Sequence, residues 1–340
     1  MKKSKVALII LLGIVGLLSF ILVPRKYEVP TFKEREGTKY WALKTGSKIG
    51  YTKIETAQPE KRNPIIYLHG GPGGKITDKI IDFLGPLSEQ GHDLYFYDQI
   101  GSGHSDRLDD ISQYSVKRHR EDLEAIISQI EAEKVIFVGK SWGACLAMNF
   151  LQTYPEQVAK IILIGPGPIL PMNRALMDEI PPDSLSLIKP AYSNKEGNER
   201  VYNWRTKMIL RWAYIFNSKL ASDKEMDDFF TYLNQELSKS TVCELKNYKQ
   251  SSTGGGGYYS HIMTVKRLNE VEDGRAKLKK LDTPILILRG QCDNQQWGYT
   301  KEYLDVLVNS KLEILEGVGH DIISGKSEAS YDLISRFLME

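Results

Sequence analysis

The sequence predicts an α/β protein built on a mainly parallel sheet, with a helical region inserted late in the chain. Short, almost continuously apolar runs alternate with helical stretches, and the first four runs occupy residues 64–68, 93–97, 134–138 and 160–164. Runs of this length that are apolar throughout are typical of strands buried on both faces, and alternation with helices favours a parallel sheet. The alternation stops after residue 165 and resumes near residue 281. A second region therefore interrupts the sheet.

The remaining elements of the sheet region follow from local patterns. Residues 39–56 carry Gly46 and Ser47 between two β-prone segments and predict a β-hairpin ahead of the parallel part. Residues 118–131 predict a helix between the second and third runs. Two further apolar runs, at residues 284–288 and 311–315, predict the last strands, and the chain closes with an amphipathic helix over residues 327–338.

The interrupting region, residues 166–280, predicts a helical cap. It opens with Pro166, Pro168 and Pro171, continues with helix-like segments and contains four consecutive glycines at residues 254–257. Such a glycine run suits either a surface linker or a mobile lid, and both interpretations stay open. The predicted division is then one sheet domain from residues 39–165 and 281–340, with the cap between its two parts.

The N-terminal segment predicts a membrane anchor. Residues 6–23 form 18 uncharged positions between Lys2, Lys3 and Lys5 on one side and Arg25 and Lys26 on the other. A span of about 17–25 residues crosses a bilayer, whereas the apolar part of a cleaved signal peptide has about 7–15. We therefore expect residues 1–26 to be an uncleaved signal anchor, with a cleaved signal peptide as the alternative. Residues 27–38 predict a tether, and the lysines favour an extracytoplasmic location for the rest of the chain.

Composition excludes several classes of partner. The 45 lysines and arginines nearly balance 43 aspartates and glutamates, so nothing in the overall charge favours nucleic acid. The three cysteines, Cys145, Cys243 and Cys292, lie far apart and match no zinc spacing. We expect neither a disulfide framework, a metal nor another cofactor, and a small molecule or a short peptide as the substrate.

The pentapeptide Gly-Lys-Ser-Trp-Gly at residues 139–143 identifies a candidate nucleophile. It follows the apolar run 134–138 and precedes a helix-like stretch at residues 144–148. A GxSxG motif between a strand and a helix is typical of a nucleophile elbow, in which small residues allow a serine to occupy a strained, exposed turn. A plain turn is the alternative. We interpret Ser141 as the nucleophile.

A candidate acid and a candidate base follow in the order that such a sheet requires. Asp293 comes shortly after the strand at residues 284–288, and His320 shortly after the strand at residues 311–315. A serine hydroxyl is a weak nucleophile at neutral pH, so a histidine must accept its proton and an acid must orient the imidazole. Asp282 and Asp321 are nearby but do not follow a strand at the expected place. Ser141, Asp293 and His320 therefore predict a catalytic triad.

A glycine-rich turn predicts the oxyanion hole. The sequence His-Gly-Gly-Pro-Gly-Gly at residues 69–74 follows the strand at residues 64–68, and its glycines allow backbone N–H groups to approach an anion closely. We expect the donors to be the backbone amides of Gly71 and Trp142. The turn lacks the Lys-Ser/Thr ending of a P-loop and the spacing of a dinucleotide fingerprint, and His69 precedes the nucleophile. We therefore expect His69 to be structural.

Three blocks of sequence together resemble the proline iminopeptidase group of α/β-hydrolases. They are residues 69–74 (HGGPGG), residues 97–105 (YDQIGSGHS, similar to the family's YDQRGSGRS) and residues 139–143 (GKSWG). The resemblance implies an α/β-hydrolase fold with a mainly parallel eight-stranded sheet and a helical cap. It also implies release of an N-terminal residue, often proline, from short peptides.

The cap departs from the family pattern where the substrate's amino group should bind. The family places one glutamate after a tryptophan and another before a His-Tyr-Phe-like stretch, but here Arg205 follows Trp204 and four glycines precede Tyr258. A buried ammonium needs a compensating charge, which Glu225, Asp227, Asp228 or Glu244 would have to supply. Aromatic side chains of the cap, among them Trp204, Tyr258 and Tyr259, are candidates for the substrate pocket, with cap core as the alternative.

The sequence therefore predicts a membrane-anchored serine hydrolase that cleaves an amide, peptide or ester bond without a metal. An aminopeptidase similar to proline iminopeptidase is the first hypothesis. A carboxylesterase or amidase with another acyl preference is the second. A catalytically silent hydrolase fold that serves as a membrane-tethered binding protein is the alternative from a different class.

Overall fold

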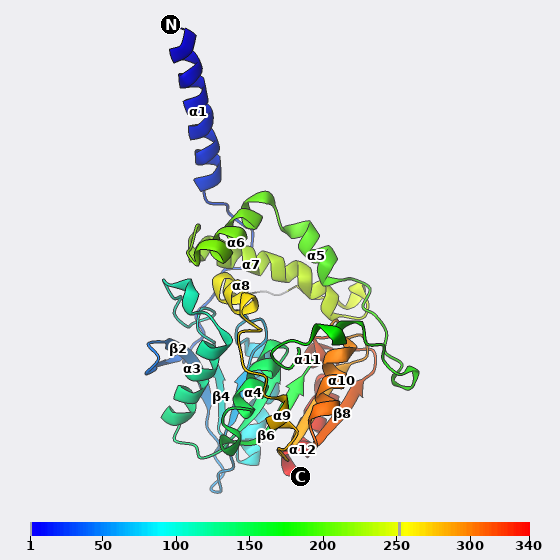
Figure 1. Ribbon diagram of the computed structural model, residues 1–340. Coiled ribbons are helices and arrows are strands. Elements are labelled where there is room, and N and C mark those ends of the chain that lie inside the picture. The colour runs from blue at the N-terminus through cyan, green and yellow to red at the C-terminus, as the bar shows by residue number, and fades with distance from the viewer. Residues whose placement is uncertain (1, 251–252) are drawn as a thin grey trace.

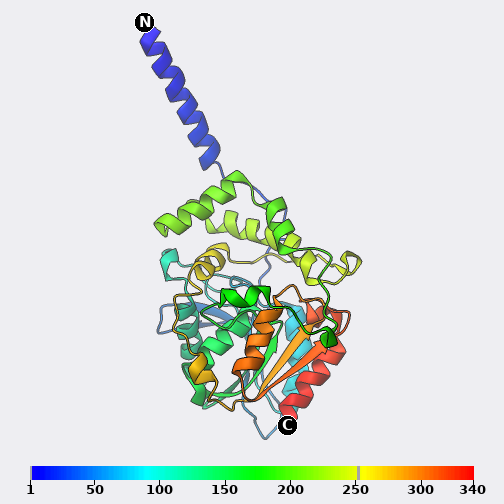
Figure 2. The same cartoon turned by 45° about the vertical axis from the view of Figure 1, so that its right-hand side comes forward.

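The structure, a computed structural model, describes residues 2–250 and 253–340, without the side chains of residues 2, 3 and 17–22. Its centre is one eight-stranded sheet in the order β1-β2-β4-β3-β5-β6-β7-β8. The pairs β1–β2 and β2–β4 are antiparallel and all the others are parallel. Helices cover both faces of this sheet, and a group of helices stands above its upper edge (Figures 1 and 2).

The strands occupy the positions that the apolar runs predict. The hairpin at residues 39–56 forms two strands, and the six later runs each form one parallel strand, with ends that shift by one or two residues. The bounds are β1 Lys39–Ala42, β2 Lys48–Ile54, β3 Ile65–Leu68, β4 Leu94–Tyr97, β5 Val135–Lys140, β6 Val158–Ile164, β7 Ile285–Gly290 and β8 Ser310–Leu315.

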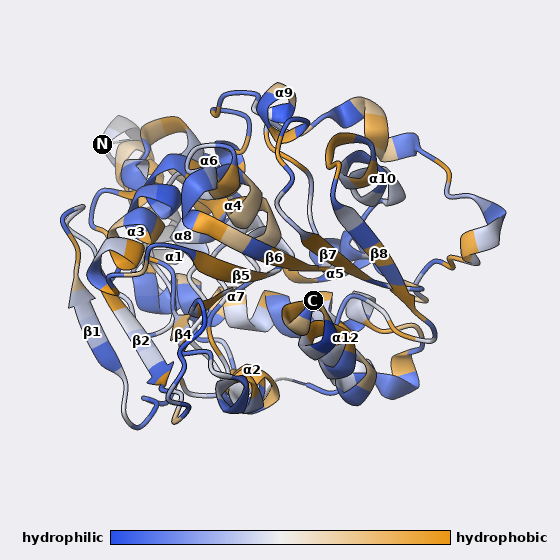
Figure 3. Ribbon diagram, turned by 90° about the horizontal axis from the view of Figure 1, so that it is seen from below, coloured by the Kyte–Doolittle hydropathy of each residue, from blue (hydrophilic) through white to orange (hydrophobic). Residues whose placement is uncertain are grey.

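Two hydrophobic layers enclose the sheet, because successive side chains of a strand point to opposite faces. In β3, Ile66 and Leu68 belong to the layer that includes residues of α3 and α4, while Ile65 and Tyr67 belong to the layer of α2, α11 and α12. Figure 3 shows the strands β5 and β7 as hydrophobic ribbons between these helices. Burial on both faces explains why these strands appear in the sequence as continuous apolar runs.

The helices of the sheet domain include the three stretches that the sequence predicts, with residues 144–148 inside α4. The predicted helix at residues 118–131 is α3, which begins after Ser115, whose side chain accepts a hydrogen bond from the Arg118 backbone N–H as an N-cap. The predicted last helix is α12. The bounds are α2 Asp78–Leu84, α3 Val116–Gln129, α4 Trp142–Leu151, α9 Arg275–Leu278, α10 Trp297–Val306, α11 Ile322–Gly325 and α12 Ser327–Met339.

The cap lies between β6 and β7 in the chain. Its helices are α5 Asn194–Val201, α6 Trp204–Phe216, α7 Asp223–Leu237 and α8 Tyr258–Lys266. Figures 1 and 2 show them together above the carboxyl ends of the parallel strands. The expectation of no disulfide is wrong: Cys243 of the cap is bonded to Cys292, which follows β7, with a Cα–Cα distance of 5.5 Å. The two cysteines are 49 residues apart, so only the tertiary structure brings them together.

The predicted membrane anchor begins with a helix, α1 Lys2–Leu22, which extends away from the rest of the molecule (Figure 2). Within residues 2–250 and 253–340, no helix combines the length and the apolar character needed to cross a membrane. The structure therefore does not support the predicted anchor. Residue 1 and the side chains of residues 2, 3 and 17–22, which belong to that prediction, lie outside the described residues.

The predicted tether, residues 27–38, contains neither helix nor strand, but it contacts both the cap and the sheet domain. The Tyr27 ring packs 5.4 Å from that of Phe229 in α7, measured between ring centroids. Further along, the Arg35 guanidinium donates hydrogen bonds to Thr52 Oγ1 of β2 and to the Ile76 carbonyl. The segment is thus fixed at both ends.

Candidate active site

Ser141 stands on a sharp turn between β5 and α4. Its φ of 55° and ψ of −113° are unusual for a residue with a side chain. The turn requires small neighbours: a Cβ on Gly143 would lie 1.9 Å from the Leu68 carbonyl oxygen, and one on Gly139 would lie 2.7 Å from the Gly143 oxygen. This is the backbone that the GxSxG motif predicts, with the serine where strand and helix meet.

Asp293 and His320 meet beyond the carboxyl ends of β7 and β8. The His320 Nδ1 lies 2.8 Å from Asp293 Oδ1, and both side chains are buried. The Gln295 backbone N–H donates to the same carboxylate oxygen. Burial alone would raise the pKa of Asp293, but the neighbouring His320 and Arg289, with these hydrogen bonds, hold it below its usual value. The carboxylate is therefore ionised at neutral pH and can orient the imidazole.

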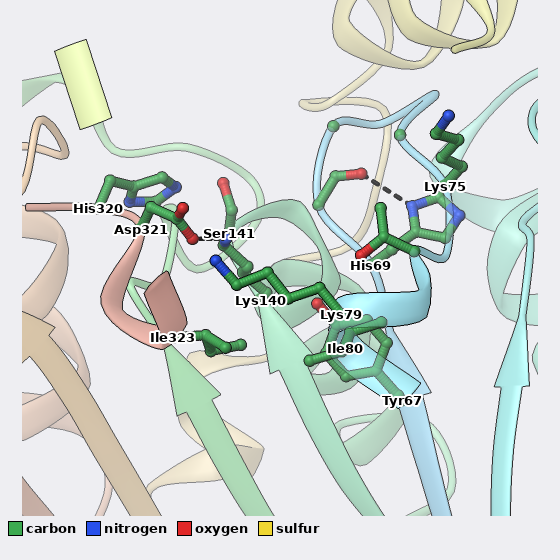
Figure 4. Close-up of a pocket in the computed structure, with 14 residues that line it drawn as sticks. Tyr67, His69, Lys75, Lys79, Ile80, Lys140, Ser141, His320, Asp321 and Ile323 are labelled. Atoms are coloured by element: carbon green, nitrogen blue, oxygen red, sulfur yellow. Dashed lines mark hydrogen bonds and ion pairs between the residues drawn. The ribbon is translucent and has the colours of Figure 1, made fainter. Parts of the chain in front are cut away.

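Ser141 and His320 line one cavity of about 280 Å³, drawn in Figure 4. Within the described part of the chain, no hydrogen bond joins the Ser141 hydroxyl to the His320 ring. Catalytic hydrogen bonds are often long or poorly aligned before the substrate binds. The structure thus brings the three predicted residues to one place, with the acid–histidine contact formed.

The loop after β3 places Gly71 on the same cavity. Gly71 has a φ of 126°, and a Cβ there would lie 2.5 Å from the Gly74 nitrogen, so the loop needs glycine at this point. In the hydrogen-bond network of the described residues, neither the Gly71 nor the Trp142 backbone N–H has an acceptor. Both amides thus lack an acceptor, and their role as the oxyanion hole stays a prediction.

His69 holds this loop in place. Its Nδ1 lies 2.8 Å from the Gly70 carbonyl oxygen, and its Nε2 accepts a hydrogen bond from the Gln99 backbone N–H. Burial lowers the pKa of His69, so the ring is neutral with the proton on Nδ1. The Gln99 side chain in turn accepts from the Trp142 indole. These contacts connect the loop to the elbow and agree with the structural role predicted for His69.

Sequence reasoning missed four charged residues that line the cavity. They are Lys75, Lys79, Lys140 and Asp321. Lys140 Nζ forms an ion pair of 3.0 Å with Asp321, so the residue before the nucleophile is joined to the residue after the histidine. Three of the four adjoin a predicted motif: Lys75 follows the glycine turn, Lys140 lies inside GxSxG and Asp321 follows His320. That adjacency is the signal that could have identified them.

The three aromatic residues proposed for the substrate pocket do not line this cavity. Tyr258 and Tyr259, at the start of α8, are fully buried in the cap core, where Tyr258 packs edge-on against Phe229. Trp204 begins α6 and is 42% exposed. The two tyrosines therefore belong to the cap core, which is the alternative interpretation. Their spacing in the sequence could not decide which face of the helix meets the core.

The four acidic residues that could have held an amino group also lie away from the cavity, and each has a partner. Glu225 accepts two hydrogen bonds of 2.9 Å from the buried Arg205 guanidinium. Asp227 pairs with Arg107, and burial raises the pKa of Asp227 to about 6 despite that arginine. The remaining pairs are Lys224–Asp228 and Lys246–Glu244.

Comparison with known proteins identifies the family of this chain. Residues 63–324 match the family described as alpha/beta hydrolase fold. The proline iminopeptidase of Saccharolobus solfataricus is 26% identical over 85% of this chain and 88% of its own length. That of Lactobacillus delbrueckii subsp. lactis is 24% identical over 82% of this chain and 90% of its own length.

Among solved structures, an esterase from Exiguobacterium antarcticum superimposes with a TM-score of 0.57 and 19% identity, over 89% of this chain and 99% of the esterase. At that identity the likeness concerns the fold alone. The family match spans most of the chain, and the two relatives match over most of their own length. The chain therefore belongs to the α/β-hydrolase fold family and is an enzyme of that family, a serine hydrolase similar to proline iminopeptidases.

Proposed function

We propose that this protein hydrolyses an acyl bond with Ser141 as nucleophile, His320 as general base and acid, and Asp293 as the group that orients the imidazole. The observation that supports this best is the buried 2.8 Å contact between His320 Nδ1 and Asp293, with Ser141 on the same cavity. Because Nδ1 donates to the carboxylate, Nε2 is left without a proton and can accept one from the serine.

The reaction has two stages. In the first, the Ser141 oxygen attacks the acyl carbonyl while His320 takes the hydroxyl proton, and the carbonyl oxygen becomes an anion between the Gly71 and Trp142 amides. The tetrahedral intermediate collapses as His320 gives its proton to the leaving group. In the second stage His320 removes a proton from water, which attacks the acyl-serine and releases the acid. Asp293 stays ionised throughout and stabilises the imidazolium.

Two substrate classes fit this chemistry. The named relatives favour release of an N-terminal residue from a short peptide, as proline iminopeptidases do by name. The pairing of Glu225, Asp227, Asp228 and Glu244 favours the second class, a carboxylesterase or amidase that does not hold a free amino group. The geometry supports the second class better, because no unpaired acid of the cap reaches the cavity within the described residues.

The experiment compares the wild type with Ser141→Ala. Both would be treated with a fluorophosphonate probe, and turnover of proline 4-nitroanilide and of 4-nitrophenyl esters would be measured. We expect labelling of Ser141 in the wild type alone and a loss of turnover of about 10⁵ to 10⁶-fold in the variant, because the triad acts as a unit. A folded wild type that is neither labelled nor active would overturn the proposal and favour a binding protein.

We also propose that residues 1–26 attach the enzyme to the outer side of a membrane. The support is the lysine cluster ahead of 18 uncharged residues, the exposure of apolar side chains such as Ile9 and Leu12 in α1, and the Cys243–Cys292 disulfide. A group of exposed apolar side chains is typical of a surface that binds another protein or a membrane. Disulfides persist in oxidising compartments, which include the outside of the cell.

Cell fractionation would test this location. The full chain should sediment with membranes and be degraded by a protease added to intact cells stripped of any outer wall, whereas a chain that begins at residue 27 should not sediment. Recovery of the full chain in the soluble fraction would contradict the proposal.

A further inference from the structure

The cavity beside Ser141 has an excess of positive charge. Its lining contains three ammonium groups, those of Lys75, Lys79 and Lys140, and a single carboxylate, that of Asp321. We call Lys75, Lys79 and Lys140 the basic wall. In Figure 4, Lys140 lies beside Asp321 and Ser141, and Lys75 lies across the view next to His69. Among the lysines and acidic residues of the lining, one carboxylate faces three cations.

The one carboxylate does not neutralise the whole wall. Asp321 pairs with Lys140 at 3.0 Å. The Lys79 ammonium donates to the Ser324 hydroxyl, which itself donates to Asp321, so Lys79 adds a second cation to the same carboxylate. Within the described residues, neither Lys75 nor Lys79 forms an ion pair with a carboxylate.

Lys75 is a partly buried lysine whose charged form an anion would stabilise. Its ammonium donates to Thr253 Oγ1 at 2.7 Å and lies 5.2 Å from the centre of the Phe32 ring. Burial lowers the pKa of the Lys75 amine to about 8, with Asp98, Arg35 and Asp78 as the charged groups around it. An ammonium that has lost part of its hydration is stabilised when an anion approaches.

None of the four cap acids considered for an amino group lines this cavity. A substrate with a free N-terminal ammonium needs an unpaired acid, and the four candidates are occupied by Arg205, Arg107, Lys224 and Lys246. Such an ammonium would instead meet the basic wall, and like charges in one site disfavour binding. The charges that line this cavity therefore favour an anion over an ammonium.

We propose that the substrate hydrolysed at Ser141 is a small acyl compound that carries a carboxylate, and that this carboxylate binds the basic wall. The inference rests on the proposed acyl hydrolysis and specifies its substrate class. The lining also contains Ile80, Ile323 and the ring of Tyr67. These groups can contact a short hydrocarbon chain between the carboxylate and the scissile carbonyl. A cavity of about 280 Å³ suits a small substrate group.

The test uses three 4-nitrophenyl esters with acyl chains of matched length: the anionic hydrogen adipate, the neutral hexanoate and the cationic 6-aminohexanoate. We expect kcat/KM of the wild type to be about tenfold higher for the adipate than for the hexanoate, because a single charge pair in a partly buried site is worth about a factor of ten or more. The aminohexanoate should be the poorest of the three. Raising the ionic strength should reduce the adipate preference.

The variants Lys79→Met and Lys75→Met identify the source of that preference. Each should lower the ratio of kcat/KM between adipate and hexanoate, and Lys79→Arg, which keeps the charge, should retain most of it. Lys79 is exposed on α2, so its replacement should leave folding intact even where that of Lys75 does not. The matched control is Lys224→Met, an exposed cap lysine, which should leave the ratio unchanged.

The outcomes separate this inference from the proposed function. Turnover of hexanoate that depends on Ser141, without any adipate preference or with a preference for the cationic ester, would overturn the inference alone. If no ester is turned over, calorimetric titration of Ser141→Ala with monomethyl adipate and with methyl hexanoate decides it. Tighter binding of the anion that weakens in Lys79→Met supports the inference, and equal binding overturns it.

Discussion

The sheet domain and the cap differ in how completely their charged residues are paired. In the sheet domain, three lysines and a single carboxylate line the cavity at Ser141, and His320 of the same lining contacts the buried Asp293. In the cap, Glu225 and Arg205 are buried together in a bidentate pair, and the other candidate acids have partners as well. Charged groups in a cleft without full compensation are candidates for a functional site, whereas removal of one partner of a buried pair destabilises the fold. The proposed chemistry and the proposed charge preference both belong to the sheet domain.

The strongest way to break this comparison is to disable the sheet domain's acid. Asp293→Asn should reduce kcat by about 10⁴-fold, because the amide no longer stabilises the imidazolium and favours the wrong tautomer. Steady-state kinetics on a neutral 4-nitrophenyl ester would measure the loss. Asp282→Asn, which changes an exposed aspartate just before β7, serves as the matched control and should behave as wild type. Comparable activity in Asp293→Asn and wild type would show that Asp293 is not the orienting acid.

A change in the cap should affect stability instead of chemistry. Glu225→Gln leaves the buried Arg205 without its counterion, which we expect to lower the free energy of unfolding by about 3–5 kcal/mol. Urea denaturation would measure this value. In the exposed pair Lys224–Asp228, the control Asp228→Asn should cost less than about 1 kcal/mol. The comparison between domains would fail if Glu225→Gln kept its stability but lost turnover of proline 4-nitroanilide, because Glu225 would then act on the substrate.

The smallest expected effect concerns pH. Since the pKa of Lys75 is lowered to about 8, the ammonium loses its proton as the pH rises through that value, and its attraction for an anion is lost with it. The ratio of kcat/KM between the anionic and the neutral ester should therefore fall between pH 7 and pH 9. Titration of the triad affects both esters equally, so it does not contribute to the pH profile of this ratio. Lys75→Arg should keep the ratio constant over this range, and a decline that persists in that variant would assign the effect to another group.

The same burial affects stability in the opposite direction. A lysine whose pKa is lower in the folded protein than in the unfolded chain binds fewer protons when folded, so it destabilises the fold most at low pH. Its cost should diminish as the pH rises from about 8 towards the ordinary lysine value of about 10.4. An anion bound to the basic wall would raise the pKa of Lys75 and remove part of this cost.

The sequence alone determined the elements that depend on local order. The apolar runs at residues 134–138 and 284–288 mark strands β5 and β7, because burial on both faces leaves no polar position in such a strand. The glycines at residues 139–143 require the tight elbow around Ser141, and a residue after a parallel strand must reach the carboxyl edge of the sheet. Chain order was therefore enough to place Asp293 and His320 with Ser141.

Only the tertiary structure decided the features that depend on distant contacts. The Cys243–Cys292 bond and the Arg205–Glu225 pair each join residues whose spacing in the sequence does not indicate a contact. The burial of Tyr258 likewise depends on segments that are distant in the chain. The basic wall likewise gathers Lys75, Lys79 and Lys140 from a loop, a helix and a strand end. The physical reason is that periodicity and turn chemistry act over a few residues, whereas the pairing and desolvation of charges depend on which surfaces the fold brings together.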